Sequence, residues 1–274
     1  MLESAKITTT NPSPSPVERI LGLLQTNWLT LASVVGAIVL WDLLAWYVDN
    51  SLFLTSLGSI LIRGAELTRS GELQTHIWIS FLEFAGGFGL AAVAGILSGV
   101  GLAASRTARG LFDPWISMLY ATPILALGPL FVLWLGIGLA SKIAIIFLTA
   151  VFPITINTLV GLTTTDRLHV EVARSLGASA GQIYTKVRIP SAIPFIIAGL
   201  RLSVARALVG VVVAELFGSR AGLGFLILTA SQSFDTAALF VGVGILAVAG
   251  VGSVYALKSL EKALAPWRFK DEEA

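Results

Sequence analysis

Six long apolar segments limit what this chain can fold into. A helix needs about 20 apolar residues to cross the roughly 30 Å hydrocarbon core of a bilayer, and each segment reaches that length. The segments lie at Trp28–Val48, Ile77–Ala104, Trp115–Leu135, Ile143–Leu162, Phe195–Phe217 and Ala237–Leu257. Only 12 % of the residues are charged, whereas a soluble domain carries about 25 %. The sequence therefore predicts an all-α integral membrane protein with six transmembrane helices in contact with membrane lipid.

The distribution of lysine and arginine predicts which ends face the cytoplasm, because cytoplasmic loops carry an excess of both. Twelve of the 18 basic residues flank one side: Lys6, Arg19, Arg106, Arg109, Arg167, Arg174, Lys186, Arg188, Lys258, Lys262, Arg268 and Lys270. Four flank the other side: Arg63, Arg69, Lys142 and Arg220. Both termini and the loop after the fourth segment are therefore predicted to be cytoplasmic.

The chain divides into three predicted regions. Residues 1–27 contain Pro12, Pro14 and Pro16, with serines between them, and predict a disordered cytoplasmic tail. Residues 28–265 form the transmembrane domain, with a polar loop at residues 163–194. Residues 266–274 form a second cytoplasmic tail.

Glycines and prolines predict local geometry within the segments. Gly95 and Gly99 form a small-xxx-small face suited to close helix packing. Pro123 and Pro129 should kink the third segment. On the outer side, five apolar residues predict a short amphipathic helix: Leu57, Ile60, Leu61, Ala65 and Leu67. The glycine-rich stretch at residues 221–225 predicts a turn folded against the outer mouth.

The polar loop reads as two short helices. The first has four residues that can form an apolar stripe: Val170, Val172, Ala173 and Leu176. Gly177 follows where a helix needs a residue that tolerates a left-handed backbone. Ser179–Gln182 has the spacing of a capping box, so a second helix should start there, and Pro190 should end it. Composition alone favours a solvated connector between two spans.

The spacing of this loop resembles the EAA loop of importer-type ABC transporter permeases. That loop runs Glu-Ala-Ala, three residues, Gly, nine residues, Ile, one residue, Leu-Pro, and four identities fall on it in register: Glu171, Ala173, Gly177 and Pro190. Other stretches resemble the nitrate/sulfonate/taurine/bicarbonate branch of these permeases: Phe112–Trp115, Gly128–Leu130, Leu133–Gly138, Ala214–Leu216 and Gly222–Gly224. The similarity covers roughly His76 to Arg268.

The resemblance implies the type I ABC importer (MetI-like) fold, with six transmembrane helices and a cytoplasmic coupling helix. The implied ATPase-coupling residues are Glu171, Ala173, Arg174, Leu176, Gly177 and Pro190. It also implies a homodimer, two cytoplasmic ABC ATPase subunits that hold ATP and Mg, and an extracytoplasmic solute-binding protein. The implied location is the bacterial cytoplasmic (inner) membrane.

The chain itself shows no enzyme constellation. No Gly-x-x-x-x-Gly-Lys-[Ser/Thr] phosphate loop occurs, so ATP hydrolysis is expected on a separate subunit. His76 and His169 fall on opposite membrane faces by the predicted topology, which excludes a His–His metal pair within one subunit. No metal site and no cofactor are expected in this chain. A net charge of +2 gives no support for a nucleic-acid partner.

Five ionisable residues lie within the predicted spans, where charge is costly and usually faces a cavity or a partner. Asp42 and Glu83 lie in the first two, and Arg201, Arg206 and Glu215 in the fifth. Arg206 is near the midplane and is predicted to face the translocation pathway, with an ion pair to Glu83 or Glu215 as the alternative. Arg201 should snorkel or stay near the preceding loop. Glu215 should contact solute or hydrogen-bond the glycine-rich outer loop.

The predicted function is ATP-driven import by alternating access of a small organic or inorganic anion, such as a sulfonate, nitrate or taurine. The candidate pathway residues are Arg206, Glu215, Tyr120 and Trp134. The aromatic residues Tyr120, Phe131 and Trp134 also suit an aromatic or vitamin-precursor solute. Two further alternatives are an ion-driven secondary transporter, for which Asp42 and Glu83 could serve, and a membrane scaffold.

Overall fold

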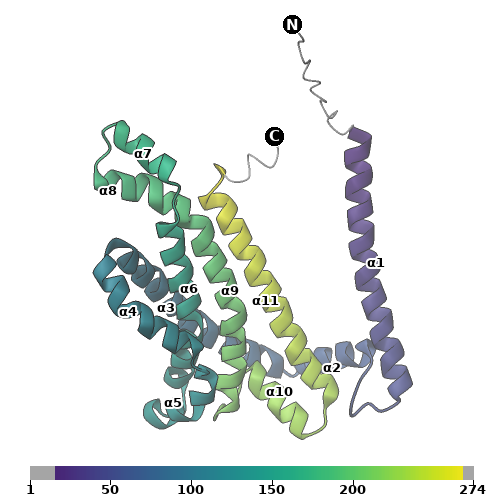
Figure 1. Ribbon diagram of the computed structural model, residues 1–274. Coiled ribbons are helices and arrows are strands. Elements are labelled where there is room, and N and C mark those ends of the chain that lie inside the picture. The colour runs from purple at the N-terminus through teal and green to yellow at the C-terminus, as the bar shows by residue number, and fades with distance from the viewer. Residues whose placement is uncertain (1–15, 268–274) are drawn as a thin grey trace. The chain divides into compact units, whose positions relative to one another are not determined.

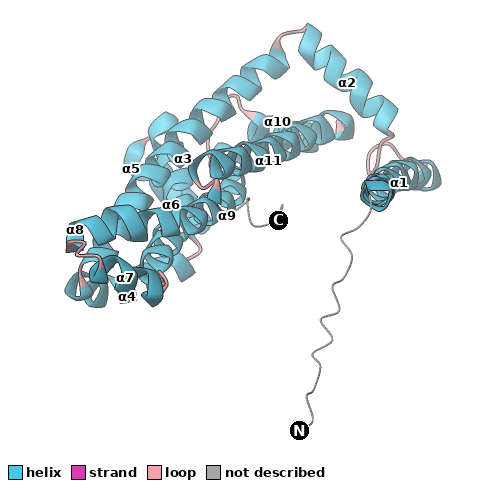
Figure 2. Cartoon of the chain, turned by 90° about the horizontal axis from the view of Figure 1, so that it is seen from above, coloured by secondary structure: helices cyan, strands magenta, loops and turns pink. Residues whose placement is uncertain are grey.

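The computed structural model describes residues 16–267, and side chains from Trp28 onward. These residues form helices joined by short loops, with no strand among them (Figure 2). Five of the described helices are long and apolar enough to cross a membrane, or six if one bent pair counts as a single span. The chain divides into two units between Ser59 and Ile60, and each is described separately.

The first unit consists mainly of α1 (Pro16–Val48). The predicted disordered tail is wrong for residues 16–27, which are helical, and residues 1–15 lie outside the described part. A proline is compatible with this start, because the N–H that it lacks has no partner in the first helical turn. The carboxylate of Asp42 accepts a hydrogen bond from the backbone N–H of Leu57 at 2.9 Å. Asp42 is therefore a local cap at the start of α2 (Leu57–Arg69), the predicted amphipathic helix.

The second unit contains the remaining elements. They are α3 (Glu72–Ala104), α4 (Arg106–Ala121), η1 (Ile124–Leu127), α5 (Gly128–Leu135), α6 (Leu139–Thr163), α7 (Arg167–Ser175), α8 (Ala180–Ile183), the π-helical turn η2 (Tyr184–Arg188), α9 (Ile189–Leu216), α10 (Leu223–Gln232) and α11 (Thr236–Leu264). Helix α6 packs against both α3 and α9, and α11 packs against α9 and α10. Figure 1 shows α7 and α8 at one end of this unit, and α5 and α10 toward the other end.

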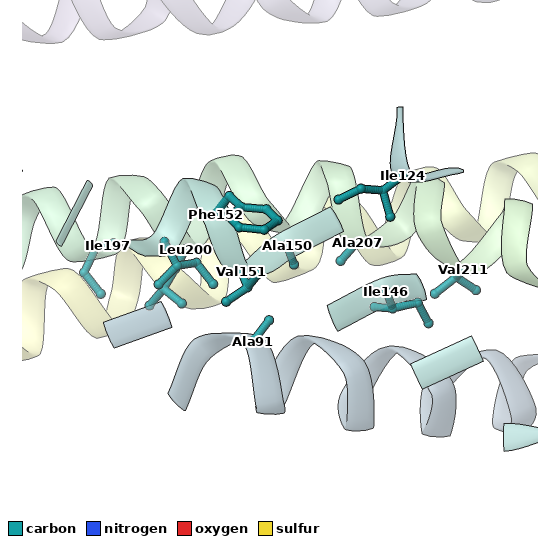
Figure 3. Close-up of a cluster of buried hydrophobic side chains, with 11 residues drawn as sticks. Ala91, Ile124, Ile146, Ala150, Val151, Phe152, Ile197, Leu200, Ala207 and Val211 are labelled. Carbon is teal, nitrogen blue, oxygen red and sulfur yellow. The ribbon is translucent and has the colours of Figure 1, made fainter. Parts of the chain in front are cut away.

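The core lies along α6. Figure 3 shows its buried side chains, which come from α6 (Ile146, Ala150, Val151, Phe152), from α9 (Ile197, Leu200, Ala207, Val211), from α3 (Ala91) and from η1 (Ile124). Small residues bring α3 close to this layer. A Cβ added at Gly87, Gly95 or Gly99 would lie within 2.5–2.8 Å of side chains of α6. The predicted close-packing face at Gly95 and Gly99 is confirmed, and its partner is α6.

Two glycines near the end of α3 allow a matched test of this packing. Gly99→Ala would place its Cβ 2.6 Å from Thr158 and 2.8 Å from the backbone oxygen of Thr155. Gly101→Ala would meet nothing within 4 Å. Because overpacking costs about 1–3 kcal/mol, we expect Gly99→Ala to lower the Tm of the purified protein and Gly101→Ala to leave it unchanged. Equal effects of both variants would contradict the close approach of α3 and α6.

The third predicted span is broken rather than kinked. Helix α4 ends at Ala121, and the helical pair at Arg106–Ala121 and Ile124–Leu135 is bent by 76°. The backbone N–H of Thr122 bonds back to Met118 and Leu119, which closes α4. Thr122 is extended, the conformation that a following proline favours, and Pro123 has no N–H to continue the ladder. The break therefore follows from the Thr122–Pro123 step.

Candidate functional site

Helix α7 begins and ends with specific caps. The carboxylate of Asp166 accepts a hydrogen bond from the backbone N–H of Leu168 at 2.9 Å. At the other end Gly177 has a φ of +79°, as its position predicted. The N–H groups of Ala178 and Gly177 bond to the carbonyls of Ala173 and Arg174, each at 3.0 Å, which is the Schellman pattern. The direction of the chain leaving α7 is therefore fixed by Gly177.

The second helix starts with the predicted capping box. The N–H of Ser179 donates to Gln182 at 2.8 Å, and the N–H of Gln182 donates to the Ser179 hydroxyl at 3.3 Å. The prediction that Pro190 ends this helix is wrong. The chain passes from α8 through the π-helical turn η2 into α9, with Pro190 in the first turn of α9. In η2 the backbone hydrogen bonds span five residues, as in the bond from the N–H of Ile189 to the carbonyl of Tyr184. Pro190 therefore follows a turn that already departs from the α-helical hydrogen-bond pattern.

An apolar stripe on α7 is uncovered in the fold. Leu168, Val172 and Leu176 recur every four residues, and their exposed fractions are 63 %, 52 % and 83 %. The predicted stripe needs correction, because Val170 and Ala173 are half-buried. Glu171 and Arg174, both exposed, accompany the stripe. An exposed apolar surface rimmed by charge is typical of a protein–protein contact.

The polar segment from α7 to η2 contacts the long helix α3. The hydroxyl of Tyr184 donates to the carbonyl of Val100 at 3.3 Å, and Ile183 is buried. A pocket of about 370 Å³ lies beside them, and Arg174 and Arg188 line it. These contacts place α8 and η2 against the end of α3.

A second pocket, of about 420 Å³, brings two predicted pathway residues together. The guanidinium of Arg206 donates to the hydroxyl of Tyr120 at 2.8 Å, and its central carbon lies 4.6 Å from the centroid of the Tyr120 ring. The ring and the cation therefore interact by charge as well as by the hydrogen bond. The alternative prediction of an ion pair from Arg206 to Glu83 or Glu215 is wrong.

The other two candidate pathway residues do not line this pocket. Trp134 is 67 % exposed on α5 and packs edge-on against Phe131, with ring centroids 6.0 Å apart. Glu215 is fully buried elsewhere. The guanidinium of Arg201 pairs with the carboxylate of Glu261, near the end of α11, at 3.0 Å, a partner that the sequence did not predict.

Glu215 belongs to a buried polar cluster that holds the start of α10. Its carboxylate accepts hydrogen bonds from the N–H groups of Gly224 at 2.5 Å and Phe225 at 3.2 Å, and from the hydroxyl of Ser80 at 2.5 Å. Ser80 also accepts from the N–H of Leu223 at 2.7 Å.

His76 completes this arrangement, because its Nδ1 accepts from the N–H of Gly222 at 2.9 Å. Four successive backbone donors at the helix start are thus satisfied by side chains of α3 and α9. The predicted hydrogen bond between Glu215 and the glycine-rich stretch is confirmed. The sequence predicted a turn here and missed α10, whose signal was the apolar run that follows Gly222.

A buried ion pair links α3 to α6. The ammonium of Lys142 lies 2.7 Å from the carboxylate of Glu83, and both side chains are buried. Sequence reasoning counted Lys142 as a loop residue and missed the pair. Within residues 16–267 no group of three or more His, Cys, Asp or Glu side chains could hold a metal ion.

Comparisons with known proteins agree on one family. The family model described as "Binding-protein-dependent transport system inner membrane component" matches residues 91–268. The Bacillus subtilis permease protein SsuC, named for aliphatic sulfonates transport, is 39 % identical over 88 % of this chain and 87 % of its own. The Escherichia coli taurine transport system permease protein TauC is 31 % identical over 90 % and 87 %. The Halalkalibacterium halodurans formylaminopyrimidine transport permease protein ThiX is 32 % identical over 85 % and 92 %.

The fold has a counterpart among solved structures. A structure of the MetNI methionine ABC transporter in inward-facing conformations superimposes with a TM-score of 0.58. The superposition covers 70 % of this chain and 95 % of the chain in that structure, and the two sequences are 18 % identical. This likeness concerns the fold alone.

Proposed function

Because the chain belongs to the family of binding-protein-dependent transport system inner membrane components, we propose that two copies of it form the pathway of an ATP-driven importer of a small anion. The membership makes the chain a permease subunit of an ABC transporter, a multi-pass membrane protein and not an enzyme. The predicted type I importer fold is confirmed. The coupling site, the second copy, the orientation and the solute are the proposal.

The uncovered stripe on α7 carries the coupling part of the proposal. Leu168, Val172 and Leu176 would enter an apolar groove of a cytoplasmic ATPase, which would bind ATP and Mg. Glu171 and Arg174 would orient the contact through charge. When ATP draws the two ATPases together, α7 and α8 would move with them and carry the end of α3 through Tyr184.

The second copy is proposed from the face of α9 that carries Arg206. Leu202, Ala205, Arg206 and Val209 are all exposed and recur at helical spacing. Arg206 lies ten residues before the end of α9, or roughly 15 Å along its axis, and so near mid-span. A guanidinium at that depth is costly against lipid. We therefore place this face toward a second copy, with a water-filled pathway between the two.

The proposed orientation of the chain in the membrane rests on its basic residues, and the proposed solute-binding partner rests on the family. The basic side of the chain, which includes α7 and α8, is placed in the cytoplasm. The opposite end, with α2 and α10, would receive solute from an extracytoplasmic solute-binding protein. Two relatives named for sulfonate and taurine transport favour an organic or inorganic anion as the solute. One relative is named for formylaminopyrimidine transport, so an uncharged aromatic compound is the alternative solute. Uptake of such a compound in place of an anion would contradict the assignment.

Removing the apolar character of the stripe tests the docking role. We expect Leu176→Asp to reduce co-purification of the ATPase by at least about tenfold, since central apolar contacts of an interface contribute about 2 kcal/mol or more. The same change at Leu61, an exposed leucine on α2, should leave co-purification unchanged. Docking through α7 would be refuted if Leu176→Asp co-purified as much ATPase subunit as the wild type and kept wild-type ATP-driven uptake.

A further inference from the structure

The guanidinium of Arg206 has hydrogen-bonding capacity that the fold does not use. A guanidinium carries five N–H donors. Within the described part of the chain one of them has an assigned acceptor, the hydroxyl of Tyr120. No carboxylate of the described residues lies within ion-pairing distance of Arg206. A cation with spare donors beside a pocket is suited to an oxyanion.

The rest of the pocket is mainly apolar. Leu148, Phe152, Leu202 and Val209 line it together with Arg206 and Tyr120. Its volume of about 420 Å³ is within the range of small-molecule sites. The hydroxyl of Thr149, which also lines it, donates to the carbonyl of Ile146 at 2.8 Å and so offers only lone pairs to a ligand. The pocket thus combines one cationic side chain with a mainly apolar wall.

Tyr120 fixes where the cation sits. Its ring lies against the guanidinium and its hydroxyl accepts one N–H, so Tyr120 holds Arg206 in the lining of the pocket. The hydroxyl is a neutral acceptor, and an anionic oxygen makes a stronger hydrogen bond to the same donor. A bound anion could therefore displace the hydroxyl while the ring contact persists.

We propose that the pocket of Arg206 and Tyr120 is a solute-binding subsite of the permease itself, for an organic anion with one oxyanion head group and a short apolar tail. The proposal rests on the transport role and deepens it. It makes the membrane subunit a second selector of solute, after the binding protein. An inorganic anion would satisfy Arg206 but leave the wall of Leu148, Phe152 and Leu202 without a partner. An uncharged aromatic solute would leave the guanidinium without a counter-ion.

The test is equilibrium binding to the permease–ATPase complex in nanodiscs, without solute-binding protein. The probes are butanesulfonate, uncharged butanesulfonamide and inorganic sulfate. The wild-type complex should bind butanesulfonate more tightly than either other probe. Arg206→Gln should weaken butanesulfonate binding by at least about tenfold, because a hydrogen bond to a charged group is lost. Arg206→Lys should retain part of the affinity, and Tyr120→Phe should retain most of it.

Three outcomes would overturn the subsite: no binding of butanesulfonate by the wild-type complex, equal binding by Arg206→Gln, or equal binding of sulfate and butanesulfonate. The subsite and the transport role can fail separately. Loss of the transport role would appear as a wild-type complex without ATP-driven uptake. Loss of the subsite alone would appear as Arg206→Gln with intact uptake and unchanged selectivity for the anion.

Discussion

Replacing Gly177 with valine is expected to lower ATP-coupled uptake by at least about tenfold while the protein still inserts into the membrane. Gly177 has a φ of +79°, and a β-branched residue is strained there. Relief of that strain would break the hydrogen bond from Ala178 to Ala173 that closes α7. The stripe of Leu168, Val172 and Leu176 would then point in a different direction relative to α8. The defect should be in coupling rather than packing, since a Cβ added at Gly177 would meet nothing within 4 Å.

Gly181→Ala provides the matched control for this variant. Gly181 lies four residues further on, inside α8, and a Cβ there would meet nothing within 4 Å. Alanine is also the better helix former, so this change should leave uptake at the wild-type level. The measurement is uptake and ATP hydrolysis by the reconstituted complex. Full coupling in Gly177→Val, at normal expression, would show that the geometry of this turn does not matter for transport.

The second large effect is expected at Glu215, and it concerns stability. Glu215→Ala would leave the N–H groups of Gly224 and Phe225 and the hydroxyl of Ser80 without their acceptor. Each unsatisfied buried group costs about 1–3 kcal/mol, so the start of α10 should detach. We expect the Tm of the purified protein to fall by at least about 6 °C, since three such groups cost about 3 kcal/mol or more and each kcal/mol lowers Tm by about 2–4 °C in a chain of this size. Thermal unfolding followed by size-exclusion chromatography would measure the change.

Two comparisons separate lost hydrogen bonds from a general sensitivity to mutation. Glu215→Gln keeps the shape and one acceptor oxygen, so its loss of Tm should be smaller. Glu66→Ala removes a surface carboxylate, 55 % exposed, that pairs with Arg63 at 3.0 Å. Such pairs contribute about 0–1 kcal/mol, so this variant should unfold near the wild-type temperature. If Glu215→Ala and Glu66→Ala had the same Tm, the hydrogen bonds of Glu215 would not hold the start of α10.

Local patterns predicted local structure well. The end of α1 at Val48 and of α3 at Ala104 agree with the apolar segments, because a run of apolar residues ends where the chain becomes polar. The left-handed Gly177 and the capping box at Ser179–Gln182 were also predicted, since each depends on residues within one turn. These local features shape the turn between α7 and α8, whereas its position against α3 depends on the distant contact of Tyr184 with Val100.

Features that depend on distant partners were missed. Glu83 pairs with Lys142, 59 positions away, and Arg201 pairs with Glu261, 60 positions away. Neither pairing leaves a periodic signal in the sequence. The continuation of the chain through Pro190 was missed because a proline normally ends a helix and the π-helical turn before it has no sequence signature. Arg206 was assigned to the pathway from its depth, but its partner Tyr120 comes from a different helix.

A single cross-linking measurement tests the central claim, that α7 is where a separate ATPase holds the permease. The chain contains no cysteine, so Leu176→Cys would introduce a unique thiol at the most exposed position of the stripe. With the ATPase present, a short thiol-reactive cross-linker should join the two proteins through this position. Leu61→Cys, exposed on α2, should give no such product. Cross-linking from Leu61→Cys and none from Leu176→Cys, in a complex that still couples ATP to uptake, would contradict the account.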